Sequence, residues 1–489
     1  MHSATDRYGV DVCLTKEDSK DVPECPHGPM LLFERFFKDG KPSAKYYACS
    51  ACRDKKDCSF FQWEKEKISK AREQAHKEII EKTRPLTQQV NYDKELEKLF
   101  QASTTNSSLL WTFCHTCNVL VWDDNGGRHN EHSLQSGEGL NELRHPSMIL
   151  KPLENVKAQA QFLFSNQATQ FLVSTIRKLG FKKVLCLGTP RVHEKIQLNK
   201  TKKSKHKPAM NSLLLDIDYR YGQFFPSGCF AYYNMFNNHF FEENGQQTLL
   251  EFMNSSEGDD MVLVMDPPFG GLVEVLAATV KKIWRFWRDC TAVKDNKKEM
   301  PTMWIFPYFM ESHIHESLPS LKMMDYKVDY ENHPHFKGKQ DKGSKRGSPV
   351  RIFTNIDPAS IKLPVEEGYR LCKICNRYVT TENFHCSKCN SCTSKDGRKY
   401  VHCDRCEKCV KPGRVHCSEC NRCDLPNHDC QRSSIKGCHI CGDMGHKRKN
   451  CPTRNQPKKR KSNVHDAKGK KSLKRKSKDS SNKEAKRRK

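Results

Sequence analysis

The chain has 489 residues of which only 36% are apolar, so several small domains with polar connections are expected instead of one large core. Lys and Arg outnumber Asp and Glu by 85 to 58, which predicts a polyanionic partner such as RNA. No long apolar run and no basic-then-apolar leader are found, so we predict a soluble intracellular protein without membrane contact.

The 25 cysteines favour zinc sites over disulfides. Most of them stand in Cys-x-x-Cys pairs near histidines, and thiolate and neutral imidazole are the ligands of a tetrahedral structural zinc ion. A secreted disulfide scaffold would carry a leader of the kind that is not found here. The sequence therefore predicts several structural Zn²⁺ ions.

The first zinc region spans residues 20–65. A Cys-x-His pair is followed by two further cysteines and by an aromatic group that ends at Trp63. The pattern resembles the GRF-type zinc finger, a family that binds single-stranded nucleic acid, and implies the ligands Cys25, His27, Cys49 and Cys58. Cys52 could replace Cys49 or Cys58. A finger that only stabilises the fold is the alternative.

The second zinc region spans residues 105–140 and has the ligand types of a finger with two cysteines and two histidines. Its predicted ligands are Cys114, Cys117, His129 and His132. The segment between the two pairs has no pattern of a base-reading helix. We therefore predict a structural role for this finger in preference to sequence readout.

Residues 150–360 have the pattern of a globular α/β domain. Two amphipathic helices are predicted, one between an N-cap at Ser165 and a stop at Gly180, the other over residues 271–290. Alternation of strands and helices predicts a doubly wound sheet that binds ligands at the carboxyl ends of its strands. The predicted buried strands are residues 182–188, 212–218, 229–234, 261–266 and 302–309.

The fourth of these strands runs into Asp266, Pro267, Pro268 and Phe269. Prolines cannot continue a strand ladder and they fix the backbone, so this segment is predicted to be a rigid turn. In methyl transfer to an adenine amine, the Asp266 carboxylate and the Pro267 carbonyl could accept from the NH₂ group while Phe269 stacks on the base. An ordinary turn at a strand end is the alternative.

Five segments together resemble the N6-adenine-methyltransferase-like family: residues 161–165, 184–192, 213–221, 230–234 and 266–269. The resemblance implies a class I Rossmann-like methyltransferase that uses S-adenosylmethionine, although the usual glycine-rich turn after the first strand is absent. It implies that Asp216 binds the ribose hydroxyls of the donor, with Asp218 as the alternative. The other donor-site residues that it implies are Gln161, Phe162, Leu163, Phe164, Arg191, Asn234 and Asp266.

The zinc modules indicate which substrate this domain takes. Family members with the same modules methylate adenosine N6 in large-subunit (28S) ribosomal RNA, so the resemblance implies a ribosomal RNA partner. Basic loops at residues 199–207 and 337–346 favour RNA, with solvated insertions as the alternative. Other members with the same turn methylate protein lysines, and a non-catalytic RNA-binding scaffold also stays open.

Residues 368–432 contain the unit His-Cys-x-x-Cys-x-x-Cys three times. Because three such sulfurs do not comfortably reach one ion, we predict a ladder of four interleaved sites that either braces another domain or binds RNA. The spacing resembles part of the DHHC palmitoyltransferases, but their nucleophile motif is absent, so acyl transfer is excluded. The predicted ligand sets are Cys372, Cys375, His385 and Cys392; Cys386, Cys389, His402 and Cys409; Cys403, Cys406, His416 and Cys423; and Cys417, Cys420, His428 and Cys430.

The C-terminal part combines a zinc knuckle with a basic tail. Residues 436–453 have the CCHC spacing, with predicted ligands Cys438, Cys441, His446 and Cys451, and such knuckles bind single-stranded RNA. The tail, residues 454–489, is too polar to fold and its Lys/Arg runs predict a nuclear or nucleolar location, with the cytoplasm as a second site. Ribosome-biogenesis or RNA-processing proteins are candidate partners.

Overall fold

The computed structural model describes most of the chain before residue 431. The described ranges are 9–14, 22–37, 42–52, 56–83, 110–121, 129–152, 162–201, 210–255, 258, 260–291, 293, 295–332 and 348–430. They belong to one unit, residues 1–434. Gln161, the knuckle ligands Cys438, Cys441, His446 and Cys451, the tail, and nearly all of both basic loops lie outside them. Within these ranges, no helix has both the length and the hydropathy for crossing a membrane.

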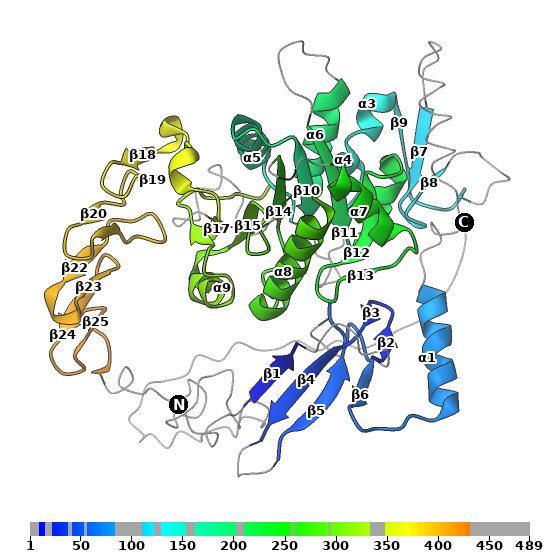
Figure 1. The fold of residues 1–489 in the computed structure, drawn as a ribbon, viewed down its shortest axis with the longest axis horizontal. Helices are drawn as coiled ribbons and strands as arrows, with labels where there is room; N and C mark the ends of the chain where they lie inside the picture. Colours follow the sequence, from blue (N-terminus) through cyan, green and yellow to red (C-terminus); the bar gives the residue numbers. More distant parts are fainter. Residues whose placement is uncertain are drawn as a thin grey trace, which may run out of the picture. The chain divides into compact units, whose positions relative to one another are not determined.

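An eight-stranded sheet forms the centre of the α/β domain (Figure 1). Its strand order is β13-β12-β11-β10-β14-β15-β17-β16, in which the five strands from β12 to β15 are parallel. These five correspond to the predicted strands and confirm the doubly wound sheet, whereas the antiparallel strands β13, β16 and β17 were not predicted. The strands are β10 (Lys183–Leu187), β11 (Asn211–Asp216), β12 (Phe230–Asn234), β13 (His239–Phe240), β14 (Met261–Met265), β15 (Thr302–Pro307), β16 (Lys322–Met323) and β17 (Val350–Thr354).

Helices cover both faces of the sheet (Figure 1). Because side chains alternate along a strand, Leu185 and Leu187 of β10 join the core under α7, α8 and α9, while Val184 and Cys186 join the core under α5 and α6. Both faces are thus buried, which explains the uninterrupted apolar runs. The helices are α5 (Asn166–Lys178), α6 (Pro190–Thr201), α7 (Gly245–Asn254), α8 (Val273–Cys290) and α9 (Glu311–Ser317).

The two helices predicted from the sequence begin and end for local reasons. Ser165 caps α5, because its hydroxyl accepts from the backbone N–H of Ala168 at 3.1 Å. Gly180 follows the helix with φ of +86°, a conformation that glycine adopts without strain. The second predicted helix is α8, whose buried side includes Trp284 and Trp287. Both predictions are confirmed.

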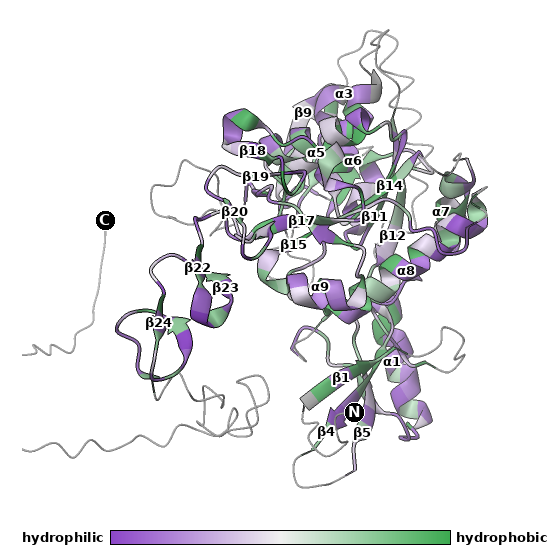
Figure 2. Cartoon of the chain, turned by 60° about the vertical axis from the view of Figure 1, so that its left-hand side comes forward, coloured by the Kyte–Doolittle hydropathy of each residue, from purple (hydrophilic) through white to green (hydrophobic). Residues whose placement is uncertain are grey.

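Two small modules precede the α/β domain. The GRF finger has the sheet β1-β4-β5-β6 and the hairpin β2-β3, followed by helix α1, which has no buried residue and is largely purple in Figure 2. The second finger has the sheet β8-β7-β9 and two short helices. The bounds are β1 (Gly9–Cys13), β2 (Glu24–Cys25), β3 (Gly28–Pro29), β4 (Leu31–Phe36), β5 (Ala44–Ala48), β6 (Phe61–Trp63), α1 (Lys70–Thr83), β7 (Leu110–Cys114), β8 (Val119–Val121), β9 (Leu134–Glu138), α3 (Leu140–Leu143) and α4 (Pro146–Ile149).

Four β-hairpins follow the α/β domain and carry the residues of the predicted zinc ladder (Figure 1). They are β18 (Tyr369–Cys372) with β19 (Arg377–Thr380), β20 (His385–Cys386) with β21 (Ser391–Cys392), β22 (Val401–Cys403) with β23 (Lys408–Val410), and β24 (Val415–Cys417) with β25 (Arg422–Asp424). The short 3₁₀ segments are η3 (Tyr219–Phe224), η4 (Tyr308–Met310), η5 (Pro358–Ser360), η6 (Val365–Glu367) and η7 (Asp404–Cys406).

Candidate active site and zinc centres

The proline-containing segment lies at the carboxyl edge of the sheet, directly after β14. The backbone N–H of Asp266 donates to the carbonyl of Leu187 at the end of β10, at 3.1 Å. A Cβ on Gly188, whose φ is +65°, would stand 3.2 Å from the Asp266 carbonyl oxygen. The loops after β10 and β14 are therefore in contact, at the position where a doubly wound sheet binds its ligand.

The Asp266 carboxyl group is held by a residue that the sequence analysis did not single out. The hydroxyl of Tyr330 donates to Asp266 Oδ1 at 2.8 Å. Burial raises the pKa of Asp266 well above its ordinary value, and this hydrogen bond lowers it in part. The ring of Tyr330 also meets Phe269 edge-on, with 5.9 Å between ring centroids. No local sequence pattern marks Tyr330, because it is 64 residues from Asp266.

The predicted donor-site segment lies beside the same tyrosine. Phe164 forms an antiparallel bridge with Tyr330, and the Leu163 N–H donates to the side chain of Asn332 at 2.7 Å. Arg191 donates to the Phe164 carbonyl at 2.9 Å and pairs with Glu331. Leu163 and Phe164 are buried, whereas Phe162 is 36% exposed. The structure thus brings Phe162, Leu163, Phe164 and Arg191 to the active-site edge.

Two acidic residues after β11 have different surroundings. Asp216 is buried, accepts from the Asp218 N–H at 2.9 Å, and has its pKa raised to about 7 by burial. Asp218 forms a buried ion pair with Arg220, with a shortest distance of 2.7 Å. Because the carboxylate of Asp218 is already bonded to a guanidinium, Asp216 is the better candidate to accept from ribose hydroxyls.

The side chain of Asn234, a predicted donor-site residue, is bonded to the GRF finger. Its side-chain amide donates to the carbonyl of His27 at 2.8 Å and to the hydroxyl of Ser50 at 3.0 Å, both in the GRF finger. Its Oδ1 accepts from the N–H of Phe236. These contacts join the end of β12 to the zinc finger. The contact of this side chain with the donor stays a prediction.

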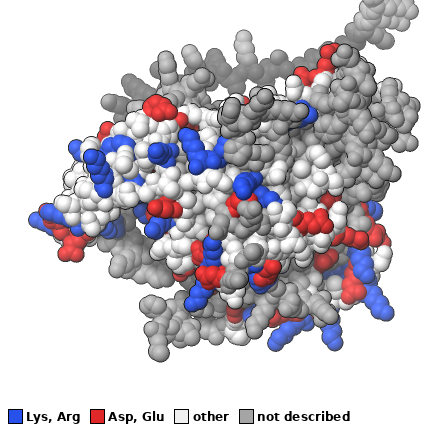
Figure 3. All heavy atoms as spheres, turned by 45° about the horizontal axis from the view of Figure 1, so that its top comes forward, with Lys and Arg blue, Asp and Glu red and all other residues white. Residues whose placement is uncertain are grey.

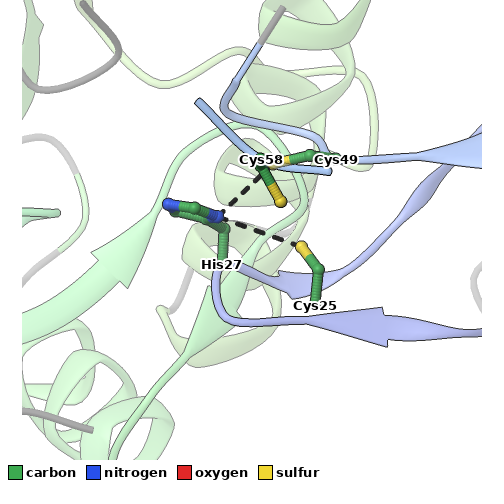
Figure 4. Close-up of side chains that lie close together, drawn as sticks. All are labelled: Cys25, His27, Cys49 and Cys58. Atoms are coloured by element: carbon green, nitrogen blue, oxygen red, sulfur yellow. Dashed lines mark hydrogen bonds between the residues drawn. The ribbon is translucent and has the colours of Figure 1, made fainter. Parts of the chain in front are cut away.

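The four predicted GRF ligands form a group whose ligand atoms all lie within 4.8 Å of one another (Figure 4). The His27 Nδ1 atom is 3.4 Å from the Cys49 sulfur and 4.0 Å from the Cys25 sulfur. Ligands of one tetrahedral zinc ion lie about 3.5 Å apart, so the group fits this metal. The Cys52 sulfur lies 3.7 Å from the other ring nitrogen of His27, Nε2. Cys52 is therefore better placed to contact the side of the ring that faces away from the metal than to bind the zinc ion itself.

The second finger brings its four predicted ligands together in the same way. The His132 Nδ1 atom is 3.5 Å from the Cys114 sulfur and 3.3 Å from the Cys117 sulfur, and His129 completes the group. The finger is bonded to the α/β domain through Gln223, which accepts from the Leu120 N–H at 2.8 Å. These contacts attach the finger to η3 of the α/β domain.

The ladder residues group in the interleaved order that the spacing predicts. The first three predicted sets are clusters with their ligand atoms within 4.8 Å. In the fourth set, the His428 Nε2 atom is 3.2 Å from the Cys420 sulfur and 3.4 Å from the Cys430 sulfur, and Cys417 lies 3.4 Å from Cys430. Each site thus takes its ligands from two successive units, which links neighbouring hairpins through one metal.

Positive φ is found at the residue directly after the Cys-x-x-Cys pair that begins each ladder site, and after the pair of the second finger. Asparagine occupies this position at four of the five pairs, and it tolerates the left-handed region better than most residues. This asparagine is a further sequence signal, beside the cysteine spacing, for the tight turn after the two cysteines. The five residues are Asn118, Asn376, Asn390, Glu407 and Asn421, with φ between 47° and 59°.

The first ladder hairpin is bonded to the α/β domain through Asp325. Its carboxylate accepts from the Thr380 N–H at 3.2 Å and from the Asn383 side chain at 2.7 Å. Arg377 lies 3.6 Å from the same carboxylate. Asp325 is 3% exposed, so this is a buried polar contact between the modules. The first zinc site of the ladder therefore braces the α/β domain.

Comparisons with known proteins agree with this site. A family model described as "Probable N6-adenine methyltransferase" matches residues 155–355, and a GRF zinc finger model matches residues 23–67. The chain is 48% identical to the rRNA N(6)-adenosine-methyltransferase ZCCHC4 of Homo sapiens, across 91% of this chain and 85% of that protein. The Mus musculus and Xenopus laevis proteins of the same name are 47% and 43% identical, with 85% and 89% of their lengths covered. The chain therefore belongs to the family of rRNA N(6)-adenosine-methyltransferase ZCCHC4 proteins.

Proposed function

We propose that the chain transfers a methyl group from S-adenosylmethionine to N6 of an adenosine in ribosomal RNA. The observation that carries this proposal is the position of Asp266 to Phe269 at the carboxyl edge of the sheet, next to the loop after β10. That loop is bonded in turn to β11, because the N–H of Gly188 donates to the carbonyl of Leu215 at 2.9 Å. Relatives that carry the name of this activity align along 91% of the chain. We further propose that the RNA belongs to the large ribosomal subunit.

The turn provides acceptors for the amino group of adenine. The Asp266 carboxylate and the Pro267 carbonyl each accept one N–H, so the nitrogen lone pair leaves its conjugation with the ring. Positive charge develops on N6 as the new bond forms, and the carboxylate stabilises it. Both prolines fix the direction of these acceptors, and Phe269 offers its ring to the base. Pro268 also accepts from the Gly271 N–H at 2.7 Å, which closes the turn.

Residues near the ends of β10 and β11 could hold the methyl donor, S-adenosylmethionine. S-adenosylmethionine supplies an electrophilic methyl group when bound. Asp216 would accept from its ribose hydroxyls, and Leu163 and Phe164 would line its pocket with Arg191 behind them. Phe162 is the most exposed of these residues, so its ring is available to pack against bound S-adenosylmethionine.

Donor affinity is expected to rise with pH, because ribose hydroxyls donate to the ionised form of Asp216. Its pKa is about 7, so the ionised fraction rises from about one tenth at pH 6 to about nine tenths at pH 8. The dissociation constant for S-adenosylmethionine, measured by titration calorimetry, should fall by up to about tenfold over this range. An Asp216→Asn variant should lose this dependence, whereas equal pH slopes in both proteins would contradict the assignment.

The zinc modules offer surfaces for single-stranded RNA. On the GRF sheet, Tyr46 meets Phe33, Phe61 and Trp63 with centroid distances of 5.0–5.7 Å, and Trp63 is 40% exposed. Half-exposed aromatic rings of this kind stack on bases. The ladder has twelve Lys/Arg against seven Asp/Glu between residues 368 and 430. Figure 3 shows Lys and Arg side chains gathered at the left, where Figure 1 places the ladder.

The C-terminal tail supports a proposal about location. Residues 453–489 contain seventeen Lys/Arg and three acids, which suits nuclear import and retention on nucleolar RNA. We propose a nuclear and nucleolar protein, present also in the cytoplasm, that acts in ribosomal RNA processing together with ribosome-biogenesis proteins. A fluorescent fusion with and without the tail would test the location.

The substrate is tested by incubating the purified protein with radiolabelled S-adenosylmethionine, total RNA and ribosomal proteins. Digestion to nucleosides should place the label in N6-methyladenosine of the large-subunit RNA. Label confined to protein lysines would replace this proposal by the lysine methyltransferase hypothesis. Donor binding without label in either fraction would favour a non-catalytic RNA-binding scaffold.

A further inference from the structure

Residues 324–332, which we name the strap, connect the first hairpin of the zinc ladder to the active site. The strap runs in extended form beside β17, with Met324 N–H donating to Ile352 and Val328 N–H to Val350 at 2.8 and 3.2 Å. At one end, Asp325 is bonded to the zinc ladder, as described above. At the other end, Tyr330 reaches Asp266. One short segment therefore contacts both sites.

The ring of Tyr330 is fixed on several sides. Only 1% of this residue is exposed, and its ring lies 5.3 Å from Phe164, 5.9 Å from Phe269 and 6.3 Å from Phe162 by centroid distance. Its backbone is held by the bridge to Phe164. The hydroxyl therefore has little freedom to move, and the Asp266 carboxylate that it contacts shares this restriction.

We propose that Tyr330 is a positioning residue for methyl transfer, whose hydroxyl holds Oδ1 of Asp266 so that the second carboxylate oxygen is directed to the adenine amine. This inference rests on the proposed function. A carboxylate that turns freely about its side-chain torsion would offer the amine a poorly aligned acceptor. With one oxygen bonded to a fixed phenol, the other oxygen keeps one direction before and during the reaction.

The same hydrogen bond favours the ionised carboxylate of Asp266, against the burial that raises its pKa. Burial raises the pKa of Tyr330 well above its ordinary value, so its hydroxyl stays protonated and donates. Of the described residues, Tyr330 is the one titratable group that shifts the pKa of Asp266, and it lowers it. On neighbouring elements, Arg191 pairs with Glu331, and Asp216 accepts from the Asp218 N–H. Loss of the hydroxyl therefore favours the protonated carboxyl group.

The test is Tyr330→Phe, which removes one oxygen atom and leaves the ring. The strap provides a matched control in Tyr326→Phe, because Tyr326 is also buried but stacks on Phe171 at 3.7 Å, away from Asp266. Rates of N6-methyladenosine formation would be measured between pH 6 and 9 for both variants and the wild type. Donor binding by calorimetry and thermal unfolding would be measured beside them.

We expect Tyr330→Phe to lower kcat on the order of tenfold to a hundredfold, with the affinity for S-adenosylmethionine changed by less than about twofold. The acidic limb of its rate profile should move to higher pH, whereas Tyr326→Phe should match the wild type. Unchanged kcat and pH profile in Tyr330→Phe, or loss of donor binding together with turnover, would overturn the inference. An inactive wild type would instead reject the proposed function itself.

Discussion

Replacement of Asp266 by alanine is expected to lower the rate of N6 methylation on the order of a thousandfold or more. The variant lacks the acceptor that turns the adenine lone pair toward the donor and the negative charge that stabilises developing positive charge on N6. The backbone of the turn should persist, because Pro267 and Pro268 and the bond from the Asp266 N–H to Leu187 remain. Single-turnover measurements with radiolabelled donor would give the rate.

Binding measurements separate this chemical role from a role in assembly. The Asp266→Ala protein should retain RNA affinity close to that of the wild type, because the proposed RNA surfaces lie on the zinc modules. An Asp295→Ala variant serves as a matched control, because Asp295 is an exposed acid in the segment after α8. Loss of RNA binding in the Asp266 variant, or turnover within about tenfold of the wild type, would contradict the proposed role.

Replacement of Asp218 by alanine is expected to lower the free energy of unfolding by about 3–5 kcal/mol. The variant leaves the guanidinium of Arg220, which is 2% exposed, without its carboxylate partner. Arg220 also donates to the Lys151 carbonyl at 3.1 Å, but a neutral acceptor does not balance a buried charge. Urea denaturation followed by tryptophan fluorescence would measure the loss.

Two further variants test whether the lost ion pair causes this decrease in the free energy of unfolding. Asp216→Asn keeps the size of the side chain and one acceptor oxygen, so it should cost less than about 1 kcal/mol while weakening donor binding. The double variant Asp218→Leu/Arg220→Met removes both charges. It should therefore recover much of the stability that Asp218→Ala loses. A loss below about 1 kcal/mol in Asp218→Ala would show that Arg220 finds other partners, and Asp218 would again be a candidate for the ribose.

The contacts of Asn234 join the GRF finger to the part of the sheet edge where we propose that the methyl donor binds. The carbonyl of His27 accepts from Asn234 at 2.8 Å and from Asn237 at 2.9 Å, so a residue expected to ligate zinc is bonded to the loop after β12. The ladder is bonded to the opposite part of the same domain through Asp325. Two zinc modules therefore support the two sides of the sheet edge where the proposed reaction takes place.

The sequence by itself determined the features that depend on near neighbours. Apolar runs identified the five parallel strands, and Ser165 and Gly180 marked the ends of α5, because caps and stops act within one turn of a helix. The interleaved ladder followed from spacing, because every ligand of a site lies within about twenty residues of the others. The Asp266 turn was marked by its own prolines.

The tertiary structure alone decided the contacts between distant segments. Tyr330 reaches Asp266 across 64 residues, and Asn234 reaches His27 across 207 residues. No local pattern distinguishes a tyrosine that holds a carboxylate from one that fills a core. Such roles arise only when folding places the second group, because a hydrogen bond depends on distance and direction, which spacing along the chain does not fix.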